Sequence, residues 1–241
     1  SFADVNSGFV VGSEGKILKT TNGGDLWTES ITGLGSVILR AVHTVSTTTA
    51  FVVGDTGTVL KTTDSGRSWI PSDLLVNWAS TDIRGLFFHT ALRGAIVGEG
   101  KISGASTLFT DTGGLSWYEL DIPLTISYVT LSDITFADSM HGWAVGSSAV
   151  VLYTSDGGTS WELQPGCAGN GTAELYSVTV SNRTKAGVVV GQTGSIACLT
   201  KDLGVTWYKE SVGGNLASDS LRGASFWEFP SPFFPDDPSK G

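Results

Sequence analysis

Short apolar runs broken by turn residues cover most of the chain. One stretch shows four such runs in succession: LRAVHTV from Leu39, AFVVG from Ala50, TVLKTT from Thr58 and SWIPS from Ser68. Runs of this length, rich in Val, Ile, Thr and aromatic residues and bounded by Gly and Asp, are strand signals. The 32 glycines favour tight turns over helices. The pattern therefore predicts an all-β protein with almost no helix.

The same phrases recur along the chain at a regular interval. Five tryptophans that end a common motif are separated by 42 to 48 residues: Trp27, Trp69, Trp117, Trp161 and Trp207. A glycine-bounded phrase precedes each of them, as GFVVG, AFVVG, GAIVG, GWAVG and GVVVG. A period near 45 residues with four strands per unit is typical of a β-propeller blade. We therefore expect a five-bladed β-propeller of four-stranded antiparallel blades.

The two ends of the chain predict how the ring closes. The first residues, FADVNSGFVVG from Phe2, align with FADSMHGWAVG from Phe136, so the chain starts at the end of an innermost strand. LRGASF (221–226) matches the innermost strand IRGLFF (83–88), and no complete blade follows it. We expect this C-terminal strand to complete blade one and so remove an open sheet edge.

Each of the five tryptophans closes a turn of the form Thr/Ser-x-Asp-x-Gly-x-x-Trp. A short carboxylate or amide can accept hydrogen bonds from the backbone of its own turn, and glycine can adopt the left-handed conformation. The tryptophan is expected to plug the space between neighbouring blades. In the third repeat Thr112 takes the acidic position, so we expect a looser turn there. We interpret the motif as structural, and its residues are Asn22, Gly24, Trp27, Asp64, Gly66, Trp69, Trp117, Asp156, Gly158, Trp161, Asp202, Gly204 and Trp207.

The phrases FADSMHGWAVG (136–146) and LYTSDGGTSW (152–161) resemble those of the Asp-box, or BNR-repeat, β-propellers. They are most similar to the photosystem II stability and assembly factor family, and the resemblance covers nearly the whole chain before its proline-rich end. It implies a repeat protein that acts as a scaffold, binds a protein partner and catalyses nothing. It also implies a periplasmic or thylakoid lumenal location. Familiar members have seven blades, whereas this chain has five repeats.

One equivalent position of the innermost strands supplies a candidate binding site. From blade one to blade five it holds Arg222, Arg40, Arg84, Ser132 and Tyr176, if the C-terminal strand belongs to blade one. Innermost strands line the central channel, so the guanidinium groups are expected to converge at one mouth. Clustered arginines need carboxylates. Internal acids near these strands are Asp82, Asp133 and Asp219; the alternative is an acidic or carboxylate-bearing segment of a protein partner, anchored by the arginines beside Tyr176.

Other functions find less support in the sequence. Sialidases with Asp-boxes also carry an Arg-Ile-Pro phrase, which this chain lacks, and we find no acidic pair at matching inner-strand positions for glycoside hydrolysis. His43, His89 and His141 lie at different repeat positions and are interpreted as surface residues. We predict no enzyme activity, no cofactor and no metal. The alternatives are a carbohydrate-binding or sialidase-like propeller and a structural module of a larger extracellular assembly.

Composition and charge narrow the class of partner. The 241 residues, 40% of them hydrophobic, are expected to form one propeller over 1–227 and a proline-rich tail over 228–241. The net charge of −9 argues against nucleic acid as a partner. No apolar run approaches the roughly 18 residues that a membrane-spanning helix needs. Because the chain begins at Ser1, we expect a processed mature protein or an excised domain.

Two further features bear on the cellular compartment. Cys167 and Cys198 are either two small buried side chains or a single disulfide between the fourth and fifth repeats. A disulfide would indicate an oxidising compartment. Asn170 and Asn182 begin possible glycosylation sites, NGT and NRT. Together with the resemblance, these features predict an extracytoplasmic protein, in the periplasm, the thylakoid lumen or secreted.

Overall fold

The described residues form five antiparallel sheets, as the repeats predict. The computed structural model describes residues 1–72, 74, 78–99, 104–123, 128–165, 173–192, 197–210 and 220–225. Within this part of the chain, four sheets have four strands and the first has three. No helix of the described residues is long and apolar enough to cross a membrane. The all-β class and the antiparallel pairing of the strands are thus confirmed.

Each repeat forms one blade whose strands pair in chain order. Blade one holds β1 (Gly8–Val11), β2 (Ile17–Thr20) and β3 (Thr28–Ser30); blade two holds β4 (Leu39–Thr44), β5 (Ala50–Gly54), β6 (Val59–Thr62) and β7 (Ile70–Pro71). Blade three holds β8 (Ile83–Phe88), β9 (Gly94–Gly98), β10 (Gly104–Thr110) and β11 (Tyr118–Pro123). Blade four holds β12 (Leu131–Phe136), β13 (Gly142–Gly146), β14 (Val151–Thr154) and β15 (Glu162–Gln164), with a 3-10 turn over Ser147–Ala149. Blade five holds β16 (Leu175–Val180), β17 (Gly187–Gly191), β18 (Ala197–Thr200) and β19 (Tyr208–Glu210).

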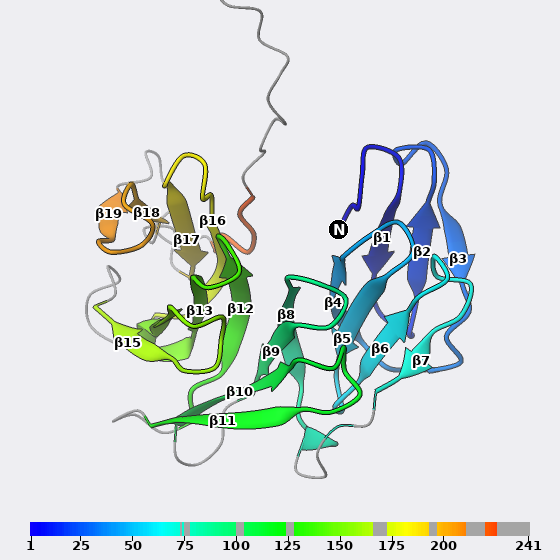
Figure 1. The fold of residues 1–241 in the computed structure, drawn as a ribbon, viewed down its shortest axis with the longest axis horizontal. Helices are drawn as coiled ribbons and strands as arrows, with labels where there is room; N and C mark the ends of the chain where they lie inside the picture. The colour runs from blue at the N-terminus through cyan, green and yellow to red at the C-terminus, as the bar shows by residue number, and fades with distance from the viewer. Residues whose placement is uncertain are drawn as a thin grey trace, which may run out of the picture.

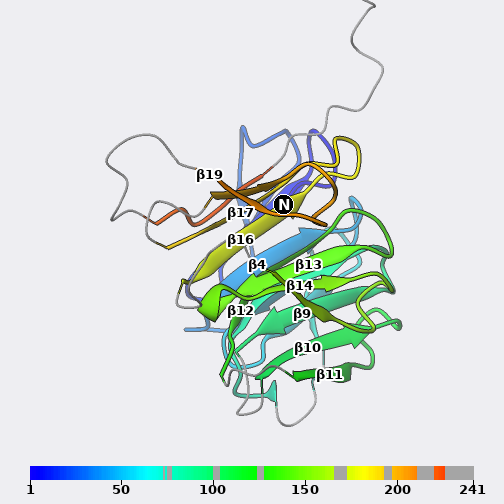
Figure 2. The same cartoon turned by 90° about the vertical axis from the view of Figure 1, so that its left-hand side faces the viewer.

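The blades follow one another in an arc around a common axis (Figure 1). Strands β4, β8, β12 and β16 lie nearest the axis and contact one another in that order, while the later strands of each blade lie outward. The side view shows the strands of blades four and five running obliquely across the molecule (Figure 2). This arrangement brings the starts of the innermost strands to one mouth of the central space.

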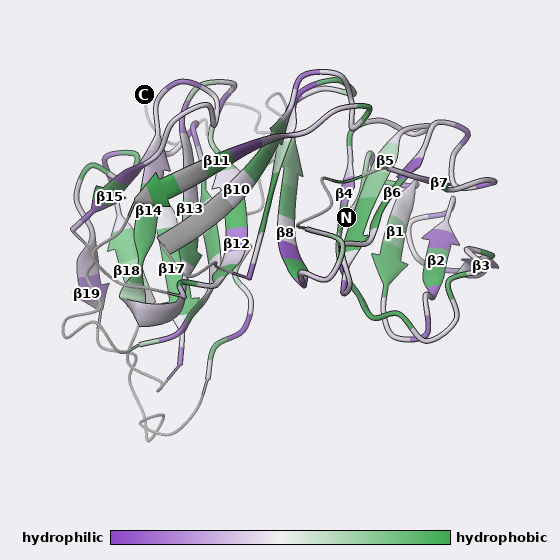
Figure 3. Cartoon of the chain, turned by 90° about the horizontal axis from the view of Figure 1, so that it is seen from below, coloured by the Kyte–Doolittle hydropathy of each residue, from purple (hydrophilic) through white to green (hydrophobic). Residues whose placement is uncertain are grey.

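Four apolar cores lie between successive blades. Each combines residues of one blade with residues of the next, and each contains the motif tryptophan of the later blade. The core between blades two and three, for example, joins Phe51 and Val53 to Ile96, Leu108 and Trp117. The hydrophobic colour in Figure 3 follows strands such as β1, β8 and β10. Because each blade buries one face against each neighbour, inter-blade packing holds the arc together.

Blade one lacks most of an innermost strand. Ser1 and Phe2 occupy the last two positions of that strand: the Phe9 N–H donates to the Ser1 carbonyl at 2.9 Å, and Phe2 bridges to Gly8. The next residues of β1 pair with β2 on one side, and on the other side no strand lies beside them among the described residues. As a result Val10 is 45% exposed, whereas Val52 and Ile96 at the same position of the next two blades are fully buried.

The segment Leu221–Ser225 lies against blade five. The Leu221 N–H donates to the Gly191 carbonyl at 3.0 Å, and no described residue of this segment pairs with β1. In Figure 1 the arc is accordingly open between blade five and blade one. The expected closure is therefore not seen in the described residues, and Phe226 and the tail over 228–241 lie outside them.

Candidate functional site

The repeated turn satisfies its own polar groups. In blade two the buried Thr62 hydroxyl accepts from the Gly66 N–H at 2.8 Å and donates to the Asp64 carboxylate at 2.8 Å. The same carboxylate accepts from the N–H of Ser68 at 3.0 Å and from its hydroxyl at 2.6 Å. These hydrogen bonds lower the pKa of Asp64 to about 2, and the bond from the Ser68 hydroxyl has the largest effect. The acidic group is thus occupied by its own turn.

The other turns repeat this geometry with different side chains. Asn22 accepts from the Leu26 N–H at 2.9 Å in blade one, and Asp156 and Asp202 accept equivalent bonds in blades four and five. In blade three the Thr112 hydroxyl accepts from the Ser116 N–H at 2.9 Å. The looser turn expected there is therefore not what the structure has, because a hydroxyl replaces the carboxylate as acceptor.

In blades two and five the glycine of the turn faces the preceding blade. Gly66 has φ +74°, and a Cβ at this position would lie 2.6 Å from the Phe9 ring of blade one. Gly204 is related in the same way to Trp143 of blade four. Trp117 and Trp161 are 5% and 9% exposed within the inter-blade cores. These contacts give the motif a packing role, and among the described residues no group of three or more His, Cys, Asp or Glu side chains has the arrangement of a metal site.

One hollow brings together all the residues of the candidate binding site. It encloses about 330 Å³, and its lining residues are Arg40, Arg84, Ser132, Tyr176 and Arg222. In the four paired innermost strands, the register with the second strand skips this position, as between Leu39 and Ala41. A bulge leaves the extra residue outside the hydrogen-bond ladder and redirects its side chain. The sequence-predicted convergence of these side chains is what the structure has.

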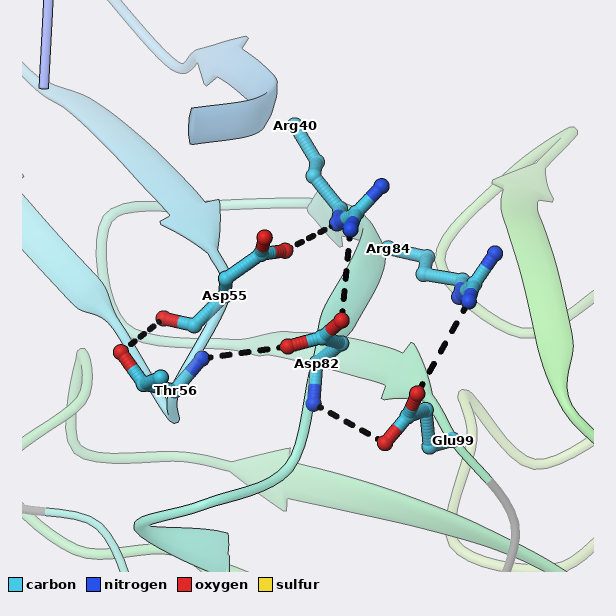
Figure 4. A network of polar contacts seen from close by, with 6 residues as sticks. All are labelled: Arg40, Asp55, Thr56, Asp82, Arg84 and Glu99. Carbon is cyan, nitrogen blue, oxygen red and sulfur yellow. Dashed lines mark hydrogen bonds and ion pairs between the residues drawn. The ribbon is translucent and has the colours of Figure 1, made fainter. Parts of the chain in front are cut away.

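Arg40 is paired internally. Its Nε donates to the Asp55 carboxylate, and its Nη2 donates to Asp82 Oδ2 at 3.3 Å (Figure 4). Asp82 also accepts from the Thr56 N–H at 3.3 Å. Burial by itself lowers the pKa of Arg40. The hydrogen bonds and charges of the two carboxylates raise this pKa by more than burial lowers it, so the net shift is upward. Arg40 therefore has its charge balanced within the protein.

Arg84 is only partly paired. Its Nη2 lies 3.8 Å from Glu99 Oε1, and Figure 4 shows the two side chains facing each other. Its Nε is buried and has no hydrogen-bond partner. A buried donor without an acceptor is costly. The side chain as a whole is 36% exposed, and the only carboxylate near it among the described residues is the distant Glu99, so the outer end of the guanidinium is open to an acceptor from outside.

Arg222 stands over an aromatic ring. Its guanidinium lies 4.9 Å from the centre of the Tyr176 ring, a cation–π contact. Among the described residues it has no carboxylate partner. Of the three internal acids proposed from the sequence, Asp82 pairs with Arg40, Asp133 bonds to Ser177 and to backbone N–H groups, and Asp219 lies outside the described residues.

The sequence alone did not identify two carboxylates that lie beside the arginines. Asp55 and Glu99 directly follow the repeated phrase of blades two and three, and the matching residues of blades one, four and five are Ser13, Ser147 and Gln192. Carboxylates thus occur at this position in blades two and three, whose innermost strands carry Arg40 and Arg84. That coincidence is the signal in the sequence, but it needs the strand register to be recognised.

The histidines lie away from the hollow. His141 shares a hydrogen bond of 2.9 Å with Asp138 on an exposed turn. His43 and His89 pack on aromatic rings, at 4.6 Å from Phe87 and 4.4 Å from Phe136. Burial lowers the pKa of His43 to about 4, which leaves it neutral at neutral pH.

The remaining predicted features fall partly outside the described residues. Cys198 is disulfide-bonded, and Cys167, the chain's other cysteine, lies outside. Asn170 also lies outside. Asn182 is exposed and accepts from Lys185 Nζ at 2.7 Å.

Comparisons of sequence give a consistent family. The family described as photosynthesis system II assembly factor YCF48 matches residues 1–75 and 109–221, well over half of the chain. The chloroplastic photosystem II stability/assembly factor HCF136 of Cyanidioschyzon merolae is 37% identical over 86 residues, which cover 34% of this chain and 19% of the relative. Its counterpart in Oryza sativa subsp. japonica is 28% identical over 130 residues, covering 50% and 30%. The chain thus spans less than a third of the length of these curated relatives.

Comparisons of structure support the propeller fold. YCF48 from Cyanidioschyzon merolae superposes with a TM-score of 0.61 at 19% identity, covering 83% of this chain and 67% of that one. An ancestral GH74 enzyme gives 0.66 at 16% identity, covering 87% and 30%. A YCF48 chain bound to D1 peptide gives 0.46 at 15% identity, covering 87% and 79%. The first two likenesses show a shared fold, and the last score is too low to support any argument about this chain.

Proposed function

Because the chain belongs to the photosystem II assembly factor family of YCF48, we propose that it is a non-enzymatic scaffold that binds a protein partner at the arginine hollow. One observation carries the proposal: among the described residues, neither the Arg84 nor the Arg222 guanidinium has a carboxylate within hydrogen-bond distance. Both side chains line the same hollow. They supply unused donors in a protein whose net charge is −9.

A carboxylate is the partner group that fits these donors best. Guanidinium groups bind carboxylates through paired, charge-assisted hydrogen bonds. Arg40 has its own acids, so we assign the ligand contacts to Arg84 and Arg222, with Tyr176 as the aromatic neighbour and Arg40 as a fixed wall of the hollow. The name of a YCF48 structure with a bound D1 peptide supports a peptide as partner in this family.

The same lining supports a function without catalysis. Glycoside hydrolysis requires two carboxyl groups at a set separation, and the five side chains around the hollow include none. The likeness to the GH74 enzyme concerns the fold alone.

We also propose that the propeller closes through Leu221–Ala224. Ser1 and Phe2 fill the last two positions of the innermost strand of blade one, which leaves four positions beside Val10, Val11 and Gly12. Four residues, rather than the six expected from the alignment, fit this space. Closure would cover the exposed Val10 and remove the open edge of β1.

The location proposed for the protein is extracytoplasmic. Relatives in the family carry the description chloroplastic. The disulfide at Cys198 supports an oxidising compartment, because cytosolic thiols are kept reduced.

The experiment for the binding site is a titration of a fluorescent D1 peptide with a free carboxylate. The double variant Arg84→Ala/Arg222→Ala is expected to weaken binding at least about tenfold, since two charge-assisted contacts are lost. Arg67→Ala, which removes the same charge from an exposed turn, serves as the control and is expected to bind within about twofold of the wild type. Equal affinity of all three proteins would overturn the assignment.

A further inference from the structure

A buried carboxylate joins blade four to blade five next to the hollow. Asp133 follows Ser132, a lining residue, and its side chain accepts three hydrogen bonds. The donors are the Ile134 N–H at 2.8 Å, the Ser177 hydroxyl at 2.8 Å and the Val178 N–H at 3.0 Å. Both of its oxygens thus accept hydrogen bonds within the protein, and none of these donors is a cation.

Ser177 links Asp133 to the segment Leu221–Ser225. A serine hydroxyl has one proton, and here it is donated to Asp133, so its lone pairs face other donors. The Ala224 N–H lies 3.4 Å from that oxygen. On the other side of Arg222, the Leu221 N–H donates to the Gly191 carbonyl at 3.0 Å. The backbone that carries Arg222 is therefore held at both ends by blade five.

Each of these two contacts recurs between another pair of blades. The Leu39 N–H donates to the Gly12 carbonyl at 2.9 Å, as Leu221 does to Gly191. The bond from Ala224 to Ser177 likewise repeats the bond from Val178 to Asp133. Leu221–Ser225 therefore lies where the innermost strand of the blade after blade five belongs.

Blades two and three lack this polar connection. The residues equivalent to Asp133 and Ser177 are Ala41 and Gly85, whose side chains have no acceptor. A polar side chain at this position occurs only where the hydrogen bonds lead to the segment bearing Arg222. These hydrogen bonds are therefore particular to blades four and five and are not part of the packing that all the blades share.

We propose that Asp133 and Ser177 are positioning residues that hold Arg222 at the hollow through the chain of hydrogen bonds from Asp133 to Ser177 to the Ala224 N–H. This role rests on the proposed function, because the two residues fix the position of an arginine that binds the ligand. Neither side chain is required to touch the partner. Burial raises the pKa of Asp133, and the bonds from Val178, Ser177 and Ile134 act against that rise.

The first test measures the segment without any partner. Hydrogen exchange of the Ala224 amide in Ser177→Ala is expected to be at least about tenfold faster than in the wild type, because its acceptor is gone. Ser181→Ala is the matched control: it removes another buried hydroxyl of blade five, the acceptor of the Thr184 N–H, and should leave the Ala224 amide unchanged. Unchanged exchange in Ser177→Ala would overturn the inference, whatever the binding data show.

The second test is a double-mutant cycle with the D1 peptide. Ser177→Ala is expected to weaken binding about as much as Arg222→Ala, and to add nothing in the Arg222→Ala background. Asp133→Asn should reproduce the effect in part, since an amide keeps one acceptor oxygen. Independent, additive losses would overturn the positioning role. If Arg222→Ala itself leaves binding unchanged, the proposed function fails, while the exchange result still decides whether the segment is held as described.

Discussion

At the scale of single residues, three arginines at one repeat position have three different environments. Arg40 is balanced by two carboxylates, Arg84 by one distant carboxylate, and Arg222 by an aromatic ring. The sequence predicted their convergence, because the position is equivalent in every blade. It did not predict their division of roles, since that depends on Asp55 and Glu99, which the strand register brings beside them.

The different environments predict different effects on stability. Arg40→Ala leaves Asp55 and Asp82 without their shared cation and is expected to lower the free energy of unfolding by about 1 kcal/mol. Arg222→Ala removes no carboxylate partner among the described residues and should change it by less than about 0.5 kcal/mol. Urea unfolding of both variants measures the contrast. Equal losses would contradict the distinction between a structural and a ligand-binding arginine.

The acidic residue of the turn predicts a pH dependence. The pKa of Asp64 is about 2 in the folded protein, below its ordinary value of 3.8, so ionisation favours folding. The stabilisation is complete above about pH 5 and is lost as the pH falls through 3.8 toward 2. Asp64→Asn keeps one acceptor oxygen, as Asn22 has in blade one, but cannot titrate. The difference in unfolding free energy between wild type and variant should therefore shrink between pH 5 and pH 2; a constant difference would contradict the account.

At the scale of elements, the turn and the strand it packs on act as a unit. Gly66 combines a left-handed backbone with close contact to Phe9, so Gly66→Ala is expected to destabilise by about 2 to 4 kcal/mol. Gly33 has φ +73° but nothing near its Cβ position. Gly33→Ala therefore isolates the backbone strain, about 1 kcal/mol. Thermal unfolding compares the two, and similar losses would mean that the contact with blade one contributes little.

Strand positions and turn residues could be read from the sequence because each depends on local pattern. The third turn was the exception: Thr112 holds its backbone as a carboxylate would, because a hydroxyl oxygen reaches the same N–H group. The bulge in each innermost strand was also missed. A bulge depends on how two strands pair, and the amino-acid sequence of one strand does not show that pairing.

At the scale of the whole molecule, the arc is open where the sequence led us to expect a closed ring. The alignment of the two chain ends predicted that residues 221–226 form an innermost strand of blade one, whereas the described residues 221–225 belong to none of the sheets. Their described contacts are with blade five, through Gly191 and Ser177. The edge of β1 and this segment are the two surfaces that closure would join.

Closure predicts a specific cross-link. By the register of the other blades, in which Gly85 lies opposite Val97, Gly223 would lie opposite Val11. Oxidation of the variant Gly223→Cys/Val11→Cys is expected to give a disulfide within one chain, seen by mass spectrometry of a monomer. Gly223→Cys/Val5→Cys, with its second cysteine on an exposed turn, should not cross-link. Failure of the first variant to cross-link, or cross-links only between chains, would contradict closure.

The central claim is that Arg84 and Arg222 bind a carboxylate of the partner, and it is tested most directly by changing both sides of the contact. The affinity of wild type and Arg84→Ala/Arg222→Ala would be measured for the D1 peptide with its carboxylates free and with them amidated. The account predicts that amidation weakens binding to the wild type about tenfold or more and leaves binding to the variant almost unchanged. An equal loss on amidation in both proteins would show that the carboxylates are bound elsewhere.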